Sequence, residues 1–203
     1  MINYPFISIE GNIGAGKSTL AGKLLEATTG VLVNERFEHN PLLPLFYKDP
    51  QRHAFSLELS FLEDRYRQLT AELPAAKNIV SDYFYAKSLV FAQVNLEGDE
   101  LALFKRFYLI LEQQMRLPDV VIYLHREISG LKDNIVSRGR SYEQNISDDY
   151  LAKITHGYQA YFRSENRFPV IWVDTHQLSG EAASAAIMGA LEKRLPNGIT
   201  RLS

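Results

Sequence analysis

Residues 11–19 read Gly-Asn-Ile-Gly-Ala-Gly-Lys-Ser-Thr and match G-x-x-x-x-G-K-[S/T] at every fixed position. Glycines let the backbone curl so that successive N–H groups face phosphate oxygens, and the following helix directs its positive N-terminus at the same anion. An apolar run precedes the stretch and an amphipathic segment follows it, which is the context that this motif requires. We therefore predict a triphosphate-binding loop formed by Gly11, Asn12, Ile13, Gly14, Ala15, Gly16, Lys17, Ser18 and Thr19.

Outward from this loop, short apolar runs alternate with longer amphipathic stretches along the chain. The runs predict buried parallel strands at Phe6–Ile9, Val31–Asn34, Asn78–Asp82, Val120–Leu124 and Val170–Val173. The amphipathic stretches predict helices at Lys17–Thr28, Gln51–Thr70, Leu89–Asn95, Asp99–Arg116, Ile128–Arg138, Ser147–Arg163 and Gly180–Lys193, with Asp99 and Ser147 as N-caps. This alternation predicts one α/β domain over residues 1–203.

Composition excludes several classes of protein. The chain has 203 residues, a net charge of −2 and no cysteine, which argues against a disulfide framework, a thiolate zinc site and a cysteine nucleophile. The chain has no excess of basic residues, which argues against binding to a nucleic-acid polymer or to an anionic membrane. The N-terminus lacks signal-peptide character, and no apolar run approaches about 18 residues. We expect a soluble, cytoplasmic protein.

Two further segments suggest phosphoryl transfer. The sequence lacks the N/T-K-x-D motif of a GTPase. It also lacks the apolar run ending in two acids that is typical of an ATPase motor. Glu35 ends the second predicted strand, where a carboxylate could take the proton of an acceptor hydroxyl; an exposed loop acid, or Glu38 as the base, are the alternatives. Arg138 and Arg140, separated by a flexible glycine, could close over a triphosphate as a lid at about 138–147, or could form a solvated turn.

Taken together, these segments resemble the deoxynucleoside kinase family over nearly the whole chain. The family's G-N-I-G-x-G-K-S-T corresponds to residues 11–19, its catalytic Glu to Glu35, and its lid pattern R-x-R-x-x-E to Arg138, Arg140 and Glu143. The family's Y-x-x-P matches Tyr47 to Pro50, and its base-reading side chain, eleven residues further on, falls on Glu58. An arginine seven residues beyond that position corresponds to Arg65.

The resemblance implies a P-loop kinase fold, with a five-stranded parallel sheet flanked by helices and an arginine-bearing lid. It implies transfer of the ATP γ-phosphoryl to the 5′-hydroxyl of a deoxynucleoside, with Glu35 as base and Lys17, Arg138 and Arg140 stabilising the phosphoryl group. It also implies that Tyr47 and Glu143 hold the sugar 3′-hydroxyl. Mg²⁺ would be held by Ser18 directly and by Asp82 through water. A homodimer through a helical face is expected, with residues 51–70 and 99–116 as candidate surfaces.

Two positions depart from the family pattern. Its third strand ends in acid-Arg-Ser, whereas this chain has Asp82-Tyr83-Phe84, so that Lys87 or Arg36 would have to supply the missing cation. The base reader is mostly Gln in the family and is Glu58 here. An ionised glutamate offers only acceptors and suits the adjacent N1–H and N2–H donors of guanine, whereas a protonated one suits adenine. Alternatively, Glu58 could be occupied by Arg65, two helical turns away.

These observations favour a deoxynucleoside kinase for a purine, deoxyguanosine or deoxyadenosine. A nucleoside monophosphate kinase resembling thymidylate kinase is the second hypothesis, because Ser81-Asp82-Tyr83-Phe84 with Ser88 resembles that family's D-R-Y-x-x-S-S. The missing arginine at position 83 argues against it. A non-catalytic nucleotide-binding regulator is the third, and the retention of Glu35, Lys17 and the lid arginines argues against that one.

Overall fold

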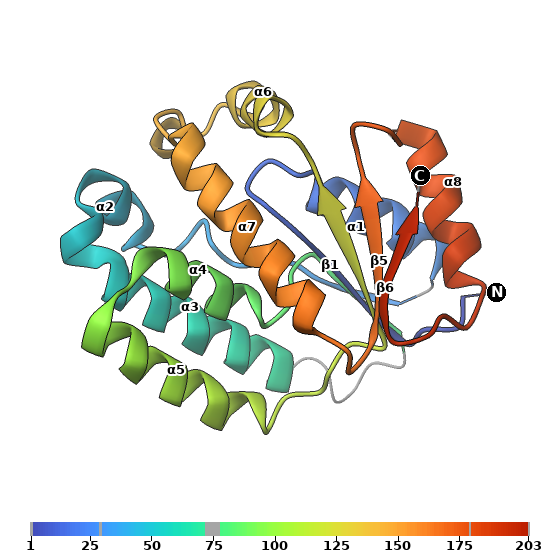
Figure 1. The fold of residues 1–203 in the computed structure, drawn as a ribbon, viewed down its shortest axis with the longest axis horizontal. Helices are drawn as coiled ribbons and strands as arrows, with labels where there is room; N and C mark the ends of the chain where they lie inside the picture. Colours follow the sequence, from blue (N-terminus) through green and yellow to red (C-terminus); the bar gives the residue numbers. More distant parts are fainter. Residues whose placement is uncertain (1, 29, 72–77, 179, 203) are drawn as a thin grey trace.

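A six-stranded parallel sheet, in the order β2-β3-β1-β4-β5-β6, forms the centre of the computed structural model (Figure 1), which describes residues 2–28, 30–71, 78–178 and 180–202. The strands are β1 (Phe6–Gly11), β2 (Val31–Val33), β3 (Ile79–Ser81), β4 (Val120–His125), β5 (Pro169–Asp174) and β6 (Gly198–Leu202). The first five lie where the sequence predicts them, so the α/β class with a parallel sheet is confirmed.

The expected count of five strands is wrong because β6 was not predicted. This strand pairs with β5 at one edge of the sheet, and its residues are half-buried or exposed. Its sequence, Gly-Ile-Thr-Arg-Leu, lacks the continuous apolar character by which the buried strands were identified. An edge strand that faces solvent needs no such run.

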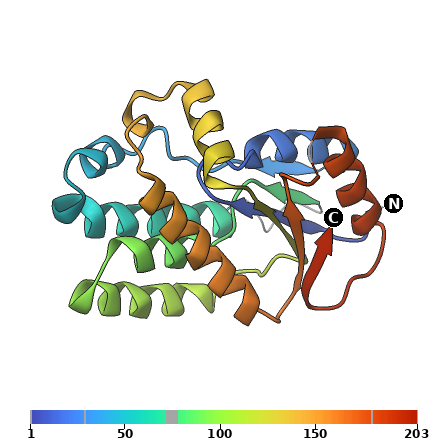
Figure 2. The ribbon, with the colours of Figure 1, turned by 45° about the horizontal axis from the view of Figure 1, so that its top comes forward.

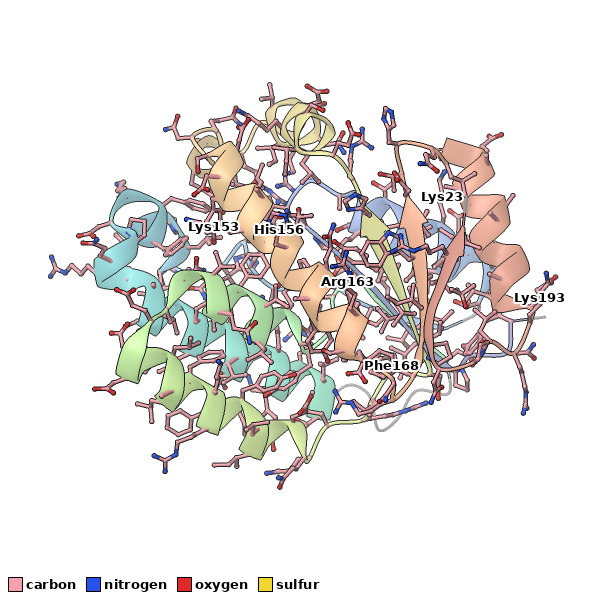
Figure 3. The ribbon with its side chains drawn as sticks, in the orientation of Figure 1. Lys23, Lys153, His156, Arg163, Phe168 and Lys193 are labelled. Carbon is pink, nitrogen blue, oxygen red and sulfur yellow. The ribbon has the colours of Figure 1, made fainter. Side chains whose placement is uncertain are left out.

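Helices cover both faces of the sheet. They are α1 (Lys17–Ala27), α2 (Leu43–Lys48), α3 (Pro50–Ala71), α4 (Lys87–Asn95), α5 (Gly98–Glu112), α6 (Ile128–Arg138), α7 (Asp148–Ser164) and α8 (Gly180–Leu191), with a 3₁₀ turn, η2, at Ser141–Glu143. In Figures 1 and 2, α3, α4, α5 and α7 lie together on one side of the sheet, whereas α1 and α8 lie on the other. Helix α7 crosses the sheet with Lys153, His156 and Arg163 on its exposed side (Figure 3).

The side-chain alternation of the strands divides the core into two layers. In β4, Val121 and Tyr123 face the layer under α3, α4, α5 and α7, while Val120, Ile122 and Leu124 face the layer under α1, α6 and α8. All five side chains are almost completely buried. Burial on both faces explains why the central strands have nearly continuous apolar sequences.

Two local predictions have different outcomes. Ser147 is the N-cap of α7, and its hydroxyl accepts a hydrogen bond from the Tyr150 N–H at 3.1 Å. Asp99 is not an N-cap, because α5 begins at Gly98 after Glu97. It lies instead in the first turn, where its negative charge interacts favourably with the helix dipole. Among the described residues, no helix is both long and apolar enough to cross a lipid bilayer.

The order of the strands determines where the functional residues meet. The loop of residues 11–19 follows β1, Glu35 follows β2 and Asp82 follows β3. These three strands are neighbours and parallel, so their carboxyl ends lie along one edge of the sheet. Ligands of open α/β sheets bind at this edge.

Candidate active site

The loop at residues 11–19 has the strand–loop–helix form that the sequence predicted. It runs from the end of β1 to the start of α1, and two of its glycines meet backbone demands that few other residues could meet. Gly14 has a φ of 82°, and a Cβ there would lie 2.5 Å from the Leu131 carbonyl oxygen. Gly16, the N-cap of α1, has a φ of 93°. The sequence at these positions is therefore required by the loop's conformation.

Lys17 lies in the centre of this loop. Its Nζ donates to the carbonyl oxygens of Gly11, at 2.8 Å, and Asn12, at 2.9 Å. Burial, with a contribution from the nearby charge of Lys87, lowers the pKa of Lys17 to about 8. A bound polyphosphate would stabilise the charged form and raise that pKa again.

Glu35 is held between two cations. Its Oε1 accepts from Arg65 Nη2 at 2.5 Å and from Arg65 Nε at 3.1 Å, while its Oε2 accepts from Lys87 Nζ at 2.5 Å. Burial alone would raise the pKa of Glu35, but the charges and hydrogen bonds of Lys87 and Arg65 outweigh it and hold that pKa far below its usual range. Glu35 is therefore an ionised carboxylate in this state, and the alternative of an exposed loop acid is wrong.

Asp82 connects Glu35 to the phosphate loop. Its Oδ1 accepts from the Glu35 N–H at 2.8 Å, and its Oδ2 accepts from the Ser18 hydroxyl at 2.7 Å. A hydroxyl and a carboxylate beside a triphosphate site are oxygen donors of the kind that Mg²⁺ prefers, and this cation is usually held by few protein groups together with phosphates and water. Ser18 and Asp82 thus fit the predicted metal role.

The predicted lid carries its charged side chains at the opening of this site. Arg138, at the end of α6, donates to Glu143 in η2, which is also 3.5 Å from Arg140. Arg140 contacts Glu38 at 3.2 Å, and its guanidinium lies 4.2 Å from the centroid of the Phe37 ring. In this state both lid arginines are therefore paired with carboxylates.

A cavity of about 440 Å³ joins these groups. Lys17, Glu35, Arg138 and Glu143 all line it, as does Tyr47, whose ring stacks on Tyr142 with centroids 5.9 Å apart. Its volume is within the range of small-molecule sites. The structure therefore brings together residues 13–19, Glu35, Tyr47, Arg65, Asp82, Arg138, Arg140 and Glu143, whereas Gly11 and Asn12 of the predicted loop do not line the cavity.

Glu58 lies apart from this lining. It is 1% exposed, its Oε1 accepts from Asn95 Nδ2 at 2.7 Å, and its Oε2 has no hydrogen-bond partner among the described residues. Burial raises the pKa of Glu58 to about 7, although the Asn95 hydrogen bond and the positive charges of Arg65 and Lys87 oppose the shift. The expected alternative of an Arg65–Glu58 hydrogen bond is wrong, because Arg65 donates to Glu35 and to Ser88 Oγ.

The two candidate replacements for the missing arginine lie in different places. Tyr83 is completely buried and its hydroxyl donates to Gln68 Oε1 at 2.8 Å. Lys87 lines the cavity and contacts Glu35, whereas Arg36 lines an adjoining hollow that includes Glu38. Of the two, Lys87 is the cation that lies against the predicted base.

Sequence reasoning missed three hydrogen bonds that join α7 to the end of β1 and to the phosphate loop. Glu10 is fully buried in β1, and its Oε1 accepts from the Tyr158 hydroxyl at 2.9 Å. Asn12 Nδ2 donates to the Leu151 carbonyl at 2.7 Å and to Thr155 Oγ1 at 2.8 Å. A glutamate at a position of β1 that must be buried was the one available signal, because such a carboxyl needs partners.

Comparison with known proteins agrees with this geometry. The deoxynucleoside kinase family model matches residues 7–195. The chain is 36% identical over 163 residues to a deoxyguanosine kinase of Bacillus subtilis (78% of this chain, 79% of the relative) and 32% identical over 186 residues to a deoxyadenosine kinase of Lactobacillus acidophilus (85% and 86%). The structure of deoxyadenosine kinase from M. mycoides with bound dATP superposes with a TM-score of 0.83 at 27% identity, covering 92% of this chain and 99% of that one. The chain belongs to the deoxynucleoside kinase family.

Proposed function

We propose that this protein transfers the γ-phosphoryl group of ATP to the 5′-hydroxyl of a purine deoxynucleoside, giving ADP and a deoxynucleoside 5′-monophosphate for nucleotide salvage. The observation that carries the proposal is one cavity in which the phosphate-binding Lys17 and the buried carboxylate of Glu35 face the same space. A phosphate donor and an acceptor hydroxyl need this proximity. The similarity to kinases of deoxyguanosine and deoxyadenosine supports the choice of substrate class.

Each residue then has a chemical task. Glu35 accepts the proton of the 5′-hydroxyl while the γ-phosphoryl moves to that oxygen. Lys17 contacts the phosphates, and Arg138 and Arg140 leave their carboxylate partners to stabilise the charge that spreads over the phosphoryl oxygens. Ser18, and Asp82 through water, would hold Mg²⁺, which would neutralise phosphate charge. Tyr47 and Glu143 also line the cavity, where they would bind the sugar 3′-hydroxyl.

The purine would be recognised by Glu58. This carboxyl has one oxygen occupied by Asn95 and one free, and it is buried where few alternative partners exist. Because it does not line the cavity in this state, reading the base requires a small rearrangement of the residues around it. The ionised form offers acceptors to guanine, and the neutral form offers a donor and an acceptor to adenine.

The direct test is transfer of labelled phosphate from ATP, with Mg²⁺, to a panel of deoxynucleosides and of nucleoside monophosphates. We expect turnover of deoxyguanosine and deoxyadenosine. Turnover of monophosphates alone would contradict the proposal in favour of the thymidylate-kinase-like hypothesis. Turnover of nothing, with ATP bound, would favour a nucleotide-binding regulator.

We also propose a homodimer that forms through α5. Leu103, Phe107 and Ile110 are 39%, 45% and 57% exposed and recur at spacings of four and three residues, so they share one face of the helix. Exposed apolar stripes of this kind mark interaction surfaces. In such a dimer, residues 1–203 would form one catalytic domain per subunit. The use of ATP fits a cytoplasmic location.

A further inference from the structure

Lys87 is a buried cation whose position invites a catalytic role. It is the first residue of α4 and only 7% exposed, and its side chain lines the cavity that holds Lys17 and Glu35. Its Nζ lies 2.5 Å from Glu35 Oε2 and 5.4 Å from the centroid of the Phe91 ring. A buried ammonium at the oxygen that would take the substrate proton either blocks that oxygen or participates in the reaction.

The two cations beside Glu35 are held differently. Arg65 donates twice to Glu35 and once to Ser88 Oγ, at 2.7 Å, and its guanidinium lies 4.9 Å from the centroid of the Phe61 ring. The side-chain ammonium of Lys87, among the described residues, donates to Glu35 alone. A lysine has a flexible stem and a compact charge, whereas the planar guanidinium is fixed by several partners at once. Arg65 therefore anchors Glu35 Oε1, and Lys87 is the cation that is free to leave Oε2.

The charge of the cavity favours such a movement when phosphate arrives. Five cations and three carboxylates line the cavity, which leaves an excess of two positive charges; they are Lys17, Arg65, Lys87, Arg138 and Arg140, and Glu35, Asp82 and Glu143. The proximity of Lys87 already helps to lower the pKa of Lys17. A triphosphate placed between these two lysines would remove their repulsion and attract both.

We propose that Lys87 is a catalytic residue that releases Glu35 Oε2 to the acceptor hydroxyl and moves onto the transferring phosphoryl group. This inference rests on the proposed function. In the step, the bond between the acceptor oxygen and the γ-phosphorus forms while the bond from that phosphorus to the bridging oxygen of ADP breaks. The bridging oxygen keeps the electron pair of the broken bond. The hydroxyl proton goes to Glu35 Oε2, and Lys87 keeps its own protons and charge throughout.

The exchange requires only a short movement of the Lys87 side chain. An acceptor oxygen hydrogen-bonded to Oε2 would lie within about two hydrogen-bond lengths, or roughly 5.5 Å, of the present position of Nζ. The flexible side chain covers such a distance without movement of α4.

Three variants separate this role from a structural one. Lys87→Gln removes the charge and retains a hydrogen-bond donor for Oε2, Lys87→Arg retains the charge, and Lys153→Gln removes an exposed lysine of α7 (Figure 3) as the matched control. Each is assayed for kcat and for the KM of ATP and of deoxynucleoside. Thermal unfolding followed by Trp172 fluorescence reports whether each variant folds.

We expect Lys87→Gln to lower kcat by about 10²–10³-fold, the effect of losing one group that stabilises transition-state charge, with little change in either KM. Lys87→Arg should retain most of the wild-type kcat, and Lys153→Gln should behave as wild type. A structural counter-ion would instead lower the melting temperature of Lys87→Gln without this selective loss of kcat at unchanged KM.

Several results would overturn the inference. These are wild-type kcat in Lys87→Gln, an equal loss of kcat in Lys87→Gln and Lys87→Arg, and an unfolded Lys87→Gln, which would show that the charge serves stability. A wild-type enzyme that phosphorylates deoxynucleosides while Lys87→Gln keeps its kcat refutes only the role of Lys87. A wild-type enzyme that phosphorylates none refutes the proposed function itself.

Discussion

Glu35 has the geometry of a base whose proton affinity is suppressed until substrate binds. Arg65 and Lys87 occupy both of its oxygens, and burial keeps the carboxylate away from bulk water. We predict that Glu35→Gln lowers kcat by about 10²–10⁴-fold, the usual contribution of a general base, while the Kd for deoxynucleoside stays near its wild-type value. Steady-state kinetics and equilibrium binding measure the two quantities.

Glu38 is the control for that prediction. It is the other acid in the same loop, but it is exposed and pairs with the lid arginine Arg140 rather than with the cations of the cavity. Glu38→Gln should therefore retain kcat within a few-fold of wild type. Should Glu35→Gln retain more than a few per cent of kcat while Glu38→Gln loses it, the base would be Glu38.

The proposed role of Glu58 makes the preferred nucleobase depend on pH. With its pKa raised to about 7, the carboxyl is largely protonated below that pH and ionised above it. The neutral form would pair with adenine and the ionised form with guanine. We predict that kcat/KM for deoxyadenosine falls as pH rises through about 7, whereas kcat/KM for deoxyguanosine does not fall. Competition between the two purines over a pH series measures this ratio.

The substitution Glu58→Gln supplies the matched variant. A glutamine donates and accepts at every pH, so the pH dependence of the ratio should disappear and preference should move toward deoxyadenosine or deoxycytidine. A buried polar group left without a partner costs about 1–3 kcal/mol, so the relative kcat/KM should change by about ten- to several-hundred-fold. Clear wild-type preference for thymidine or deoxycytidine would contradict this role of Glu58.

At the scale of elements, we expect the predicted lid and the phosphate loop to act at different stages. Lys17 belongs to the loop and would contact ATP in the ground state, so Lys17→Ala should raise the Kd for ATP as well as lower kcat. Arg138 and Arg140 are paired with carboxylates in the present state and become available only when the lid rearranges. The double variant Arg138→Ala/Arg140→Ala should therefore lower kcat with a smaller change in ATP affinity.

Calorimetric titration with ATP, beside steady-state kinetics, distinguishes the two effects. Equal losses of ATP affinity in the Lys17 variant and in the double variant would show that the lid arginines already bind ATP in the ground state. The position of Arg140 on Phe37 and Glu38 argues against that result, because a ground-state ligand would have to displace both contacts.

The elements that could be predicted are those whose sequence carries a strong local signal. Strand β1, the phosphate loop and α1 follow from an apolar run joined to a motif whose glycines the backbone requires. Helix α2 was missed because it is short, and strand β6 because it is half-exposed at the sheet edge and lacks an apolar run, so tertiary contacts rather than local pattern determine them.

The same limit applies to the site. Glu35 and Asp82 could be placed at one sheet edge because strand ends in parallel sheets share an edge. The contact between Lys87 and Glu35 joins residues 52 positions apart, and that between Asn95 and Glu58 joins residues 37 apart. Neither spacing is set by one helix or strand, so only the packing of α3, α4 and the sheet reveals these partners.

At the scale of the molecule, α7 connects the lid to the phosphate loop. It follows the lid directly, and it binds the loop through Asn12 and, by way of the Tyr158 hydroxyl, through Glu10. These partners are buried, so the hydrogen bonds are costly to break. Any displacement of α7 on lid closure must therefore be small or must carry the phosphate loop with it.

The proposed homodimer predicts how the whole molecule behaves in solution. The stripe on α5 of Leu103, Phe107 and Ile110 lies beside the buried Phe104 and Tyr108, so an aspartate on the exposed side need not disturb the core. We predict that Phe107→Asp/Ile110→Asp sediments as a monomer at concentrations where the wild-type chain sediments as a dimer, since desolvating two charges at an apolar contact is unfavourable.

Val136→Asp is the matched control, because Val136 is 62% exposed on α6 and lies outside the stripe. It should sediment as wild type does. A stable interface usually buries about 800 Å² on each partner, more than three side chains supply, so neighbouring parts of α5 or α3 must contribute. A wild-type chain that remains monomeric at all concentrations would contradict the dimer. A double variant that stays dimeric would show that the interface lies on another face, because the α5 face could not accommodate two buried carboxylates per subunit.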